Sequence, residues 1–147
     1  MQSQAQRLMD LFDRLRAITL EWNPIGDLPI GPRQVAALEC VASAPGCNLH
    51  HVAECLKLTR PTVTVGVQRL EAEGLLRREA DERDQRAVRL FLTPAGEEFL
   101  RRSRAYRREK MERLLAGLSL DEQETLLRLL ERALQASEEA ARPDDER

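Results

Sequence analysis

Apolar residues recur at spacings of three and four over most of this chain of 147 residues, a pattern typical of amphipathic helices. Residues 23–32 include three prolines and two glycines and predict a connector. Helices are expected before it, at 4–22, and after it, at about 31–43 and 48–57. The first of these helices has one apolar stripe, formed by Leu8, Leu11, Phe12, Leu15, Ile18 and Trp22.

The segment 59–73, TRPTVTVGVQRLEAE, predicts a helix with a narrow apolar stripe and a broad polar face. Thr59 suits the N-cap, where its side-chain oxygen would accept a backbone N–H, and Pro61 suits the first turn. Gly74 suits the position after the helix, where positive φ is common. The stripe consists of Val63, Val67 and Leu70. The polar face carries groups that hydrogen-bond to base edges and phosphates, at Arg60, Thr62, Thr64, Gln68 and Arg69.

A tight turn joins the helices predicted at 48–57 and 59–73, which is the plan of a helix-turn-helix. Asn48 is the expected N-cap of the first helix, and Lys57 occupies the place in the turn where glycine is common. Because the second helix would expose its polar face, we interpret it as a DNA-recognition helix. The expected core residues before it are Val35, Leu38, Val41, Leu49, Val52, Ala53 and Leu56.

Two strands are predicted after the recognition helix, at 75–79 and 87–92. The second strand alternates between two sets of residues, with Val88, Leu90 and Leu92 on one side and Arg89 and Phe91 on the other. The connection 80–86, ADERDQR, is too polar for a core and too short for another element. We interpret the pair as a hairpin that forms a wing beside the helix-turn-helix.

Two further helices are predicted towards the C-terminus. Thr93 and Pro94 suit the start of a helix that runs to about residue 116. Its many arginines predict a mostly solvated surface, with partners at helical spacing among Glu97, Glu98, Glu109 and Glu112. Ser119 and Glu122 form a capping box that opens a last helix to about residue 140. One face of that helix carries Leu126, Leu127, Leu130 and Leu134.

Basic residues are concentrated around the predicted recognition helix, although the whole chain has a net charge of −2. Residues 57–113 hold 15 Lys and Arg against 10 Asp and Glu, a local net charge of +5, and the remainder carries −7. This distribution favours contact with nucleic-acid phosphates. The sequence has no signal-peptide pattern, no apolar run long enough for a membrane span and an odd number of cysteines. We therefore expect a cytoplasmic protein without a disulfide framework.

The run 58–100 resembles the MarR family of winged helix-turn-helix repressors. Three pieces carry the match by their order and spacing: RLEAEGLL, DERDQRAV and LTPAG. The resemblance implies a mainly α (α+β) fold, a winged helix-turn-helix with N- and C-terminal dimerisation helices that intertwine in an obligate homodimer. The expected division is a dimerisation helix at 1–30, the winged domain at 31–93, dimerisation helices at 94–140 and a polar tail at 141–147. Alternatively, the first and last helices pack only on each other within one chain.

The resemblance also implies how DNA is read, with each recognition helix of the homodimer in a major groove of a palindromic double-stranded operator. The helix residues expected to contact DNA are Arg60, Thr62, Thr64, Val65, Gln68 and Arg69, where the Val65 methyls suit a thymine methyl. In the wing, the family's Asp-x-Arg pattern falls on Asp84 and Arg86, implying an ion pair and an arginine in the minor groove, with Arg83 as second candidate. The alternatives are a solvated helix face, and wing residues that only stabilise the hairpin.

Members of the family commonly respond to small aromatic acids or phenols, so the resemblance implies a ligand-responsive repressor. The candidate ligand-binding residues are Arg16, Trp22, Leu38 and Tyr106. A metal- or thiol-redox-responsive regulator that uses Cys40, Cys47, His51 and Cys55 is an alternative. His51 and Cys55 have the i, i+4 spacing that can bind zinc, with Cys47 one turn earlier. Only the nearby Lys57 and Arg60 favour a low thiol pKa.

No catalytic pattern is found in the sequence, so we expect neither an enzyme nor a bound cofactor. It has no glycine-rich phosphate loop and no G-x-S-x-G motif, and its two histidines have no nucleophile at a recognised spacing. A winged-helix adaptor that binds protein instead of DNA remains an alternative. Binding to duplex DNA that weakens steeply with salt would distinguish a regulator from an adaptor.

Overall fold

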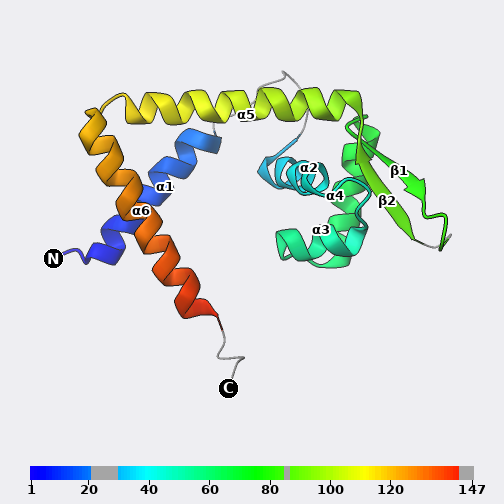
Figure 1. Ribbon diagram of the computed structural model, residues 1–147, viewed down its shortest axis with the longest axis horizontal. Helices are drawn as coiled ribbons and strands as arrows, with labels where there is room; N and C mark the ends of the chain where they lie inside the picture. The colour runs from blue at the N-terminus through cyan, green and yellow to red at the C-terminus, as the bar shows by residue number, and fades with distance from the viewer. Residues whose placement is uncertain (21–29, 85–86, 143–147) are drawn as a thin grey trace. The chain divides into compact units, whose positions relative to one another are not determined.

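The computed structural model describes residues 1–20, 30–84 and 87–142 of the chain (Figure 1). The chain forms two compact units, Met1–Arg108 and Glu109–Arg147, each of which is described by itself. The elements in the described residues are α1 (Gln4–Leu20), α2 (Pro32–Ser43), α3 (Leu49–Leu56), α4 (Arg60–Ala72), β1 (Leu76–Ala80), β2 (Val88–Leu92), α5 (Pro94–Leu115) and α6 (Leu120–Ala141).

The core of the first unit lies where α2, α3 and α4 pack on one another and on the β1–β2 hairpin (Figure 1). Leu38, Val52, Leu70 and Leu90 come from these four parts and are fully buried. Phe99 and Leu100 add the first turns of α5 to the same core. The predicted fold class, mainly helical with a two-stranded wing and helices at both ends, is confirmed.

The turn of the helix-turn-helix is tight because Lys57 adopts a left-handed backbone conformation, with φ +54°. Its N–H donates to the Glu54 carbonyl at 3.3 Å, and the Leu58 N–H donates to the Ala53 carbonyl at 3.0 Å. At the other end of α3, Asn48 caps the helix as predicted, accepting the His51 N–H at 2.8 Å. Lys57 thus holds a conformation that glycine adopts more readily.

The end of α4 is fixed by Gly74, which has φ +73° as the prediction requires. Its N–H donates to the Glu71 carbonyl at 2.9 Å, and the Leu75 N–H donates to the Leu70 carbonyl at 2.9 Å. Leu75 therefore belongs to the helix cap, and β1 begins at Leu76, one residue later than the predicted strand.

The hairpin is tied to the turn between α2 and α3. β1 and β2 are antiparallel, with Leu76 opposite Leu92. The Gly46 N–H donates to the Leu90 carbonyl and the Leu90 N–H donates to the Cys47 carbonyl, both at 2.8 Å. These bonds place the base of the wing against the three-helix core.

The start of α5 is packed directly on the backbone that leaves α4. The Thr93 hydroxyl donates to the Gly74 carbonyl at 2.5 Å and accepts the Gly96 N–H at 3.0 Å, so Thr93 is the N-cap as predicted. A Cβ atom at Gly96 would lie 2.1 Å from the Leu75 carbonyl oxygen. The LTPAG motif therefore needs its glycine for close packing.

The terminal helices α1 and α6 expose their apolar stripes. On α1, 46% of Phe12 is exposed, and on α6, 60% of Leu134. The predicted capping box of α6 is present, with the Ser119 hydroxyl accepting the Glu122 N–H at 3.2 Å and the Glu122 carboxylate accepting the Ser119 N–H at 2.8 Å. In the parts of the chain that the structure describes, no helix has the length and apolarity that a membrane span requires.

Candidate nucleic-acid interface

Helix α4 has two faces of opposite character, and the core fixes which one is turned outwards. Val63, Val67 and Leu70 are buried in the first unit, as the predicted stripe requires. The predicted DNA-contact residues of the helix lie on the other side: Arg60, Thr62, Val65, Gln68 and Arg69 are exposed and Thr64 is half-buried. The structure therefore brings the whole predicted helix set to one accessible surface.

The hydroxyl groups near the start of α4 are used within the helix itself. Thr59 occupies the N-cap position, but the prediction that its side chain caps a backbone N–H is wrong. The Thr59 and Thr62 hydroxyl oxygens instead hydrogen-bond to each other at 2.9 Å. The Thr64 hydroxyl donates to the Arg60 carbonyl at 2.9 Å, which leaves its oxygen lone pairs as the accessible function.

Val65 is the one large apolar side chain on the outward face of α4 among the described residues, with 59% exposed. Its neighbours on that face, Thr62, Gln68 and Arg69, are polar and exposed. An isolated valine among hydrogen-bonding groups suits contact with a thymine methyl in the major groove.

The wing is attached to the recognition helix by an ion pair that the sequence pattern did not reveal. The Arg78 Nε–H donates to the Glu71 carboxylate at 2.8 Å, and its terminal nitrogen pairs with the same carboxylate. Glu71 lies on α4 and Arg78 on β1, seven positions apart across a turn, where neither helical nor strand periodicity applies. The ion pair links α4 to the first strand of the hairpin.

At the tip of the wing, Arg83 and Asp84 are exposed, and the Arg83 N–H donates to the Asp81 carboxylate at 2.9 Å. Arg86, the first candidate for the minor groove, and with it the predicted Asp84–Arg86 pair, lies outside the described residues. Further along the hairpin, Arg77 and Arg89 lie over the Phe91 ring, at 4.5 and 5.4 Å from its centroid. Sequence reasoning did not select these two arginines.

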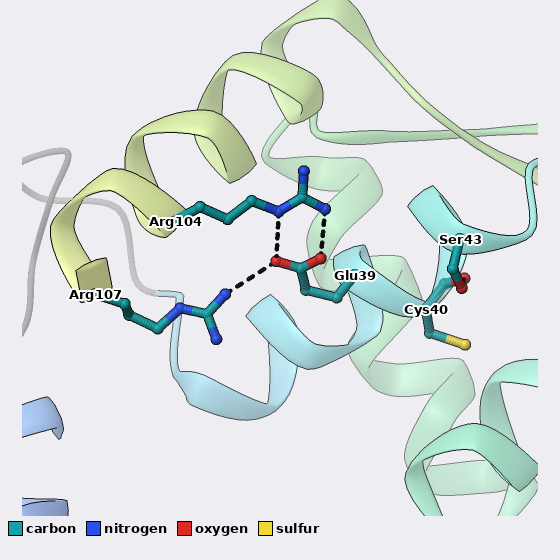
Figure 2. A network of polar contacts seen from close by, with 5 residues as sticks. All are labelled: Glu39, Cys40, Ser43, Arg104 and Arg107. Carbon is teal, nitrogen blue, oxygen red and sulfur yellow. Dashed lines mark hydrogen bonds and ion pairs between the residues drawn. The ribbon is translucent and has the colours of Figure 1, made fainter. Parts of the chain in front are cut away.

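A carboxylate of α2 binds two arginines of α5 (Figure 2). Glu39 accepts hydrogen bonds from Arg104 at 3.0 and 2.5 Å and from Arg107 at 3.0 Å. The Arg104 hydrogen bond is the main cause that lowers the pKa of Glu39 below its ordinary value, against the opposing effect of burial. The same hydrogen bond with Glu39 raises the pKa of Arg104 above its ordinary value.

Three further arginines of α5 are exposed and paired within the helix, as predicted for some of its basic residues. Arg101 and Arg102 both bind Glu98, whose pKa they lower to about 2, and Arg113 binds Glu109. Arg104 and Arg107 instead bind Glu39, a partner on another helix that spacing along α5 does not indicate.

The residues predicted to bind an effector lie in different surroundings. Leu38 is fully buried in the core, Tyr106 is half-buried on α5 and Arg16 is exposed on α1. Trp22 lies outside the described residues. The assignment of these four residues to an effector site stays a prediction.

The cysteines differ in exposure, with Cys40 buried, Cys47 half-buried and Cys55 exposed. In residues 1–20, 30–84 and 87–142, no three His, Cys, Asp or Glu side chains are placed to hold a metal ion. The assignment of a metal site to Cys47, His51 and Cys55 stays a prediction.

Comparison with known proteins agrees with this arrangement. A model of the MarR family matches residues 28–87. The HTH-type transcriptional regulator YkoM of Bacillus subtilis (strain 168) is 34% identical over 102 residues, which cover 69% of this chain and 66% of YkoM. Transcriptional regulator HosA of Escherichia coli O111:H- is 31% identical over 103 residues, which cover 70% of this chain and 76% of HosA.

A solved structure of Streptococcus pneumoniae FabT in complex with DNA shows the same fold. It superposes with a TM-score of 0.77 at 23% identity, covering 92% of this chain and 96% of FabT. MarR regulators bind DNA operators, typically as dimers. Because the identity to HosA extends over most of that protein and the family model matches the helix-turn-helix, this chain belongs to the MarR family of winged helix-turn-helix, DNA-binding transcriptional regulators, which are not enzymes.

Proposed function

We propose that this protein is a repressor that binds a palindromic operator as a homodimer and releases it when a small aromatic effector binds. The observation that carries the proposal is the division of α4 into a buried stripe, Val63, Val67 and Leu70, and an accessible polar face. A helix held in this way by its own domain has its polar face free for a major groove. Two such helices in a dimer would read half-sites about 10 base pairs apart, or a multiple of that.

The chemistry of the exposed face suits both base edges and phosphates. Gln68 presents an amide, which can bind adenine through two hydrogen bonds, and Thr64 presents acceptor lone pairs. Arg60 lies in the first turn of α4, next to the positive end of the helix dipole, and suits a phosphate. Arg69 and Thr62 extend the same surface, and Val65 supplies the thymine contact.

We assign the minor groove to the wing. Arg86 is the first candidate because of the Asp-x-Arg pattern, and Arg83 the second, since its side chain is exposed at the tip. Asp84 would hold the inserted arginine. The Glu71–Arg78 ion pair supports a joint action of wing and helix, because it fixes β1 against α4.

We propose that a second copy of the chain packs on the exposed apolar stripes of α1 and α6. Large apolar side chains such as Phe12 and Leu134 stay open to solvent on these helices. Apolar surfaces of this kind usually mark an interface. In the proposed division, 1–30 and 94–140 dimerise and 31–93 binds DNA.

An effector would act by changing how the winged domain is held. Tyr106 lies on α5 between Arg104 and Arg107, the two arginines that bind Glu39 of α2. A ligand that displaced part of this contact would loosen α2 from α5. This supports an effector site near Tyr106, with Arg16, Trp22 and Leu38 as the other candidates.

The test is DNA binding by the full chain. A duplex selected from a random pool is titrated with protein by fluorescence anisotropy at several salt concentrations, and sedimentation gives the stoichiometry. We expect two chains per palindromic duplex and an affinity that falls steeply with salt, because phosphate contacts release counterions. Failure to select any duplex, or binding that does not depend on salt, would favour the adaptor alternative.

A further inference from the structure

A groove of about 200 Å³ lies between the start of α2 and the recognition helix α4. The helices α2, α3 and α4, which pack on one another, all contribute to it (Figure 1). Arg33 lines the groove from α2, and Thr62 and Arg69 line it from α4. The lining between them is apolar and includes the buried side chains of Ala37, Val52, Val63 and Val67. We call this site the α2–α4 groove.

Gly66 keeps the α2–α4 groove open on the side of α4. It lies within the helix, its φ is not positive, and a Cβ atom there would meet nothing within 4 Å. Neither backbone conformation nor close packing therefore requires a glycine at this position. A glycine within a helix costs about 0.5–1 kcal/mol relative to alanine. The space is thus kept at a cost in stability, which indicates that something occupies it.

We propose that the α2–α4 groove seats a sugar–phosphate strand of the operator, with Arg33 as a phosphate contact outside the recognition helix. A helix that enters the major groove has a DNA backbone along each of its sides. Thr62, Gly66 and Arg69 follow one another at spacings of four and three, so the α2–α4 groove runs along one side of α4. The strand that borders the major groove on that side would pass over it.

The charges that line the α2–α4 groove suit a phosphate. Arg33 on α2 and Arg69 on α4 are both exposed, so a phosphate held there would meet a cation from each helix. Within residues 1–20, 30–84 and 87–142, no carboxylate binds the Arg33 guanidinium. Arg33 also lies outside the basic stretch 57–113, so charge counting along the sequence did not select it.

The size of the α2–α4 groove favours part of a long molecule over a separate small effector. Pockets for small molecules usually have volumes of about 300–1,000 Å³. This groove, at about 200 Å³, is smaller. It suits one unit of a polymer, because a deoxyribose can pack on the apolar lining while its phosphate stays with the exposed guanidinium groups. Phosphate contacts of this kind fix the register of a protein on its duplex without reading sequence.

The first experiment compares Arg33→Ala with the unmodified full chain by fluorescence anisotropy on the selected duplex, across a salt series. Loss of one phosphate contact should weaken binding to all duplexes alike and reduce the slope of log affinity against log salt by about 1. Arg132→Ala removes the same charge from α6 and should alter neither quantity. An unchanged slope for Arg33→Ala would overturn the phosphate contact.

The second experiment locates the phosphate. A series of duplexes each carries one uncharged methylphosphonate in place of a phosphate. We expect one position at which this replacement weakens binding by the unmodified chain but not by Arg33→Ala, because both changes remove the same contact. Losses that add to that of Arg33→Ala at every position would overturn the assignment.

The third experiment fills the α2–α4 groove. Gly66→Leu should lower DNA affinity about tenfold without lowering the melting temperature, because its side chain would occupy the place of the strand. Gly66→Ala adds only a methyl group and should lower affinity by less, and it serves where the leucine variant does not fold. Variants that fold and bind the duplex as tightly as the unmodified chain would overturn the seating of the strand.

This inference rests on the proposed function, but the two fail in different ways. An unmodified chain that selects no duplex contradicts the proposed function. An unmodified chain that binds its duplex, with a salt slope and a methylphosphonate profile that Arg33→Ala does not change, contradicts this inference alone.

Discussion

Glu39 of α2 accepts two hydrogen bonds from the guanidinium of Arg104 on α5, at 3.0 and 2.5 Å (Figure 2). Arg107, one turn further along α5, adds a third at 3.0 Å. The contact joins α5 to α2 across 65 and 68 positions of the chain. The carboxylate is 29% exposed, but the two arginine side chains are half exposed, which limits what the contact contributes to stability.

We predict that Glu39→Gln lowers the free energy of unfolding by about 0.5–1 kcal/mol at neutral pH. The folded-state pKa of Glu39 lies below its ordinary value of 4.5, so its stabilising effect is fully present above that value. It is lost as the pH falls through the folded pKa. Urea unfolding followed by circular dichroism should therefore give a difference between the two proteins at neutral pH that shrinks as the pH falls below 4.5.

The control for this prediction is a double-mutant cycle. The double variant Glu39→Gln, Arg104→Gln should lose less unfolding free energy than the sum of the two single variants, because both changes remove the same contact. Glu39→Gln combined with Arg101→Gln should be additive, since Arg101 binds Glu98 and not Glu39. Additive behaviour in both cycles would contradict an energetic link between α2 and α5.

The fold was largely predictable because it depends on local patterns. The spacing of Val63, Val67 and Leu70 predicted which face of α4 is buried, and Ser119 with Glu122 predicted the start of α6. Such signals lie within one or two turns of a helix. The predicted element types agree with the structure throughout the described residues, and the bounds differ by one or two residues.

The candidate site was less predictable where it depends on contacts between distant segments. Glu39 and Arg104 lie 65 positions apart, and no periodicity relates them. The Thr59 cap failed for a local reason, because Thr62 offers its hydroxyl a competing partner. Arg86 and Trp22 lie outside the described residues and stay predictions.

Gly96→Ala should destabilise the protein by about 1–3 kcal/mol, since the added methyl would overlap the Leu75 carbonyl, 2.1 Å from its oxygen. The neighbour is backbone, and the Leu75 carbonyl also accepts the Thr93 N–H at 3.1 Å, so it is not free to move. Thermal unfolding at fixed protein concentration measures the effect.

Gly66→Ala is the matched comparison for Gly96→Ala. A Cβ at Gly66 would have nothing within 4 Å, and the residue lies within α4. We expect it to stabilise the helix by about 0.5–1 kcal/mol, since alanine loses less conformational entropy on folding than glycine. If both substitutions moved the melting temperature in the same direction, the close packing at Gly96 would not be the cause.

Lys57→Gly should raise the free energy of unfolding by about 0.5–1 kcal/mol. The left-handed conformation costs a residue with a side chain roughly 1–2 kcal/mol, and glycine avoids this cost. Part of the gain is lost because glycine loses more conformational entropy on folding than lysine does. The reverse change, Gly74→Ala, meets no atom within 4 Å yet has φ +73°, so its cost would be backbone strain alone. Urea unfolding that showed Lys57→Gly to be destabilising would mean that the lysine side chain contributes more than its backbone costs.

Arg60→Ala and Gln68→Ala should affect DNA binding in different ways, although both residues are exposed on α4. Arg60 is assigned to a phosphate, so its loss should weaken binding to all duplexes alike and reduce the slope of log affinity against log salt by about 1. Gln68 is assigned to a base edge, so its loss should leave that slope unchanged. Gln68→Ala should lower the binding free energy by about 1–3 kcal/mol on the preferred duplex, and by less on a duplex altered at the contacted base pair.

Anisotropy titrations of both variants on the two duplexes, across a salt series, measure these quantities. Arg132→Ala removes the same charge from α6, a helix to which no DNA contact is assigned, and should alter neither quantity. Equal losses for Gln68→Ala on both duplexes would show that α4 does not read sequence through this side chain.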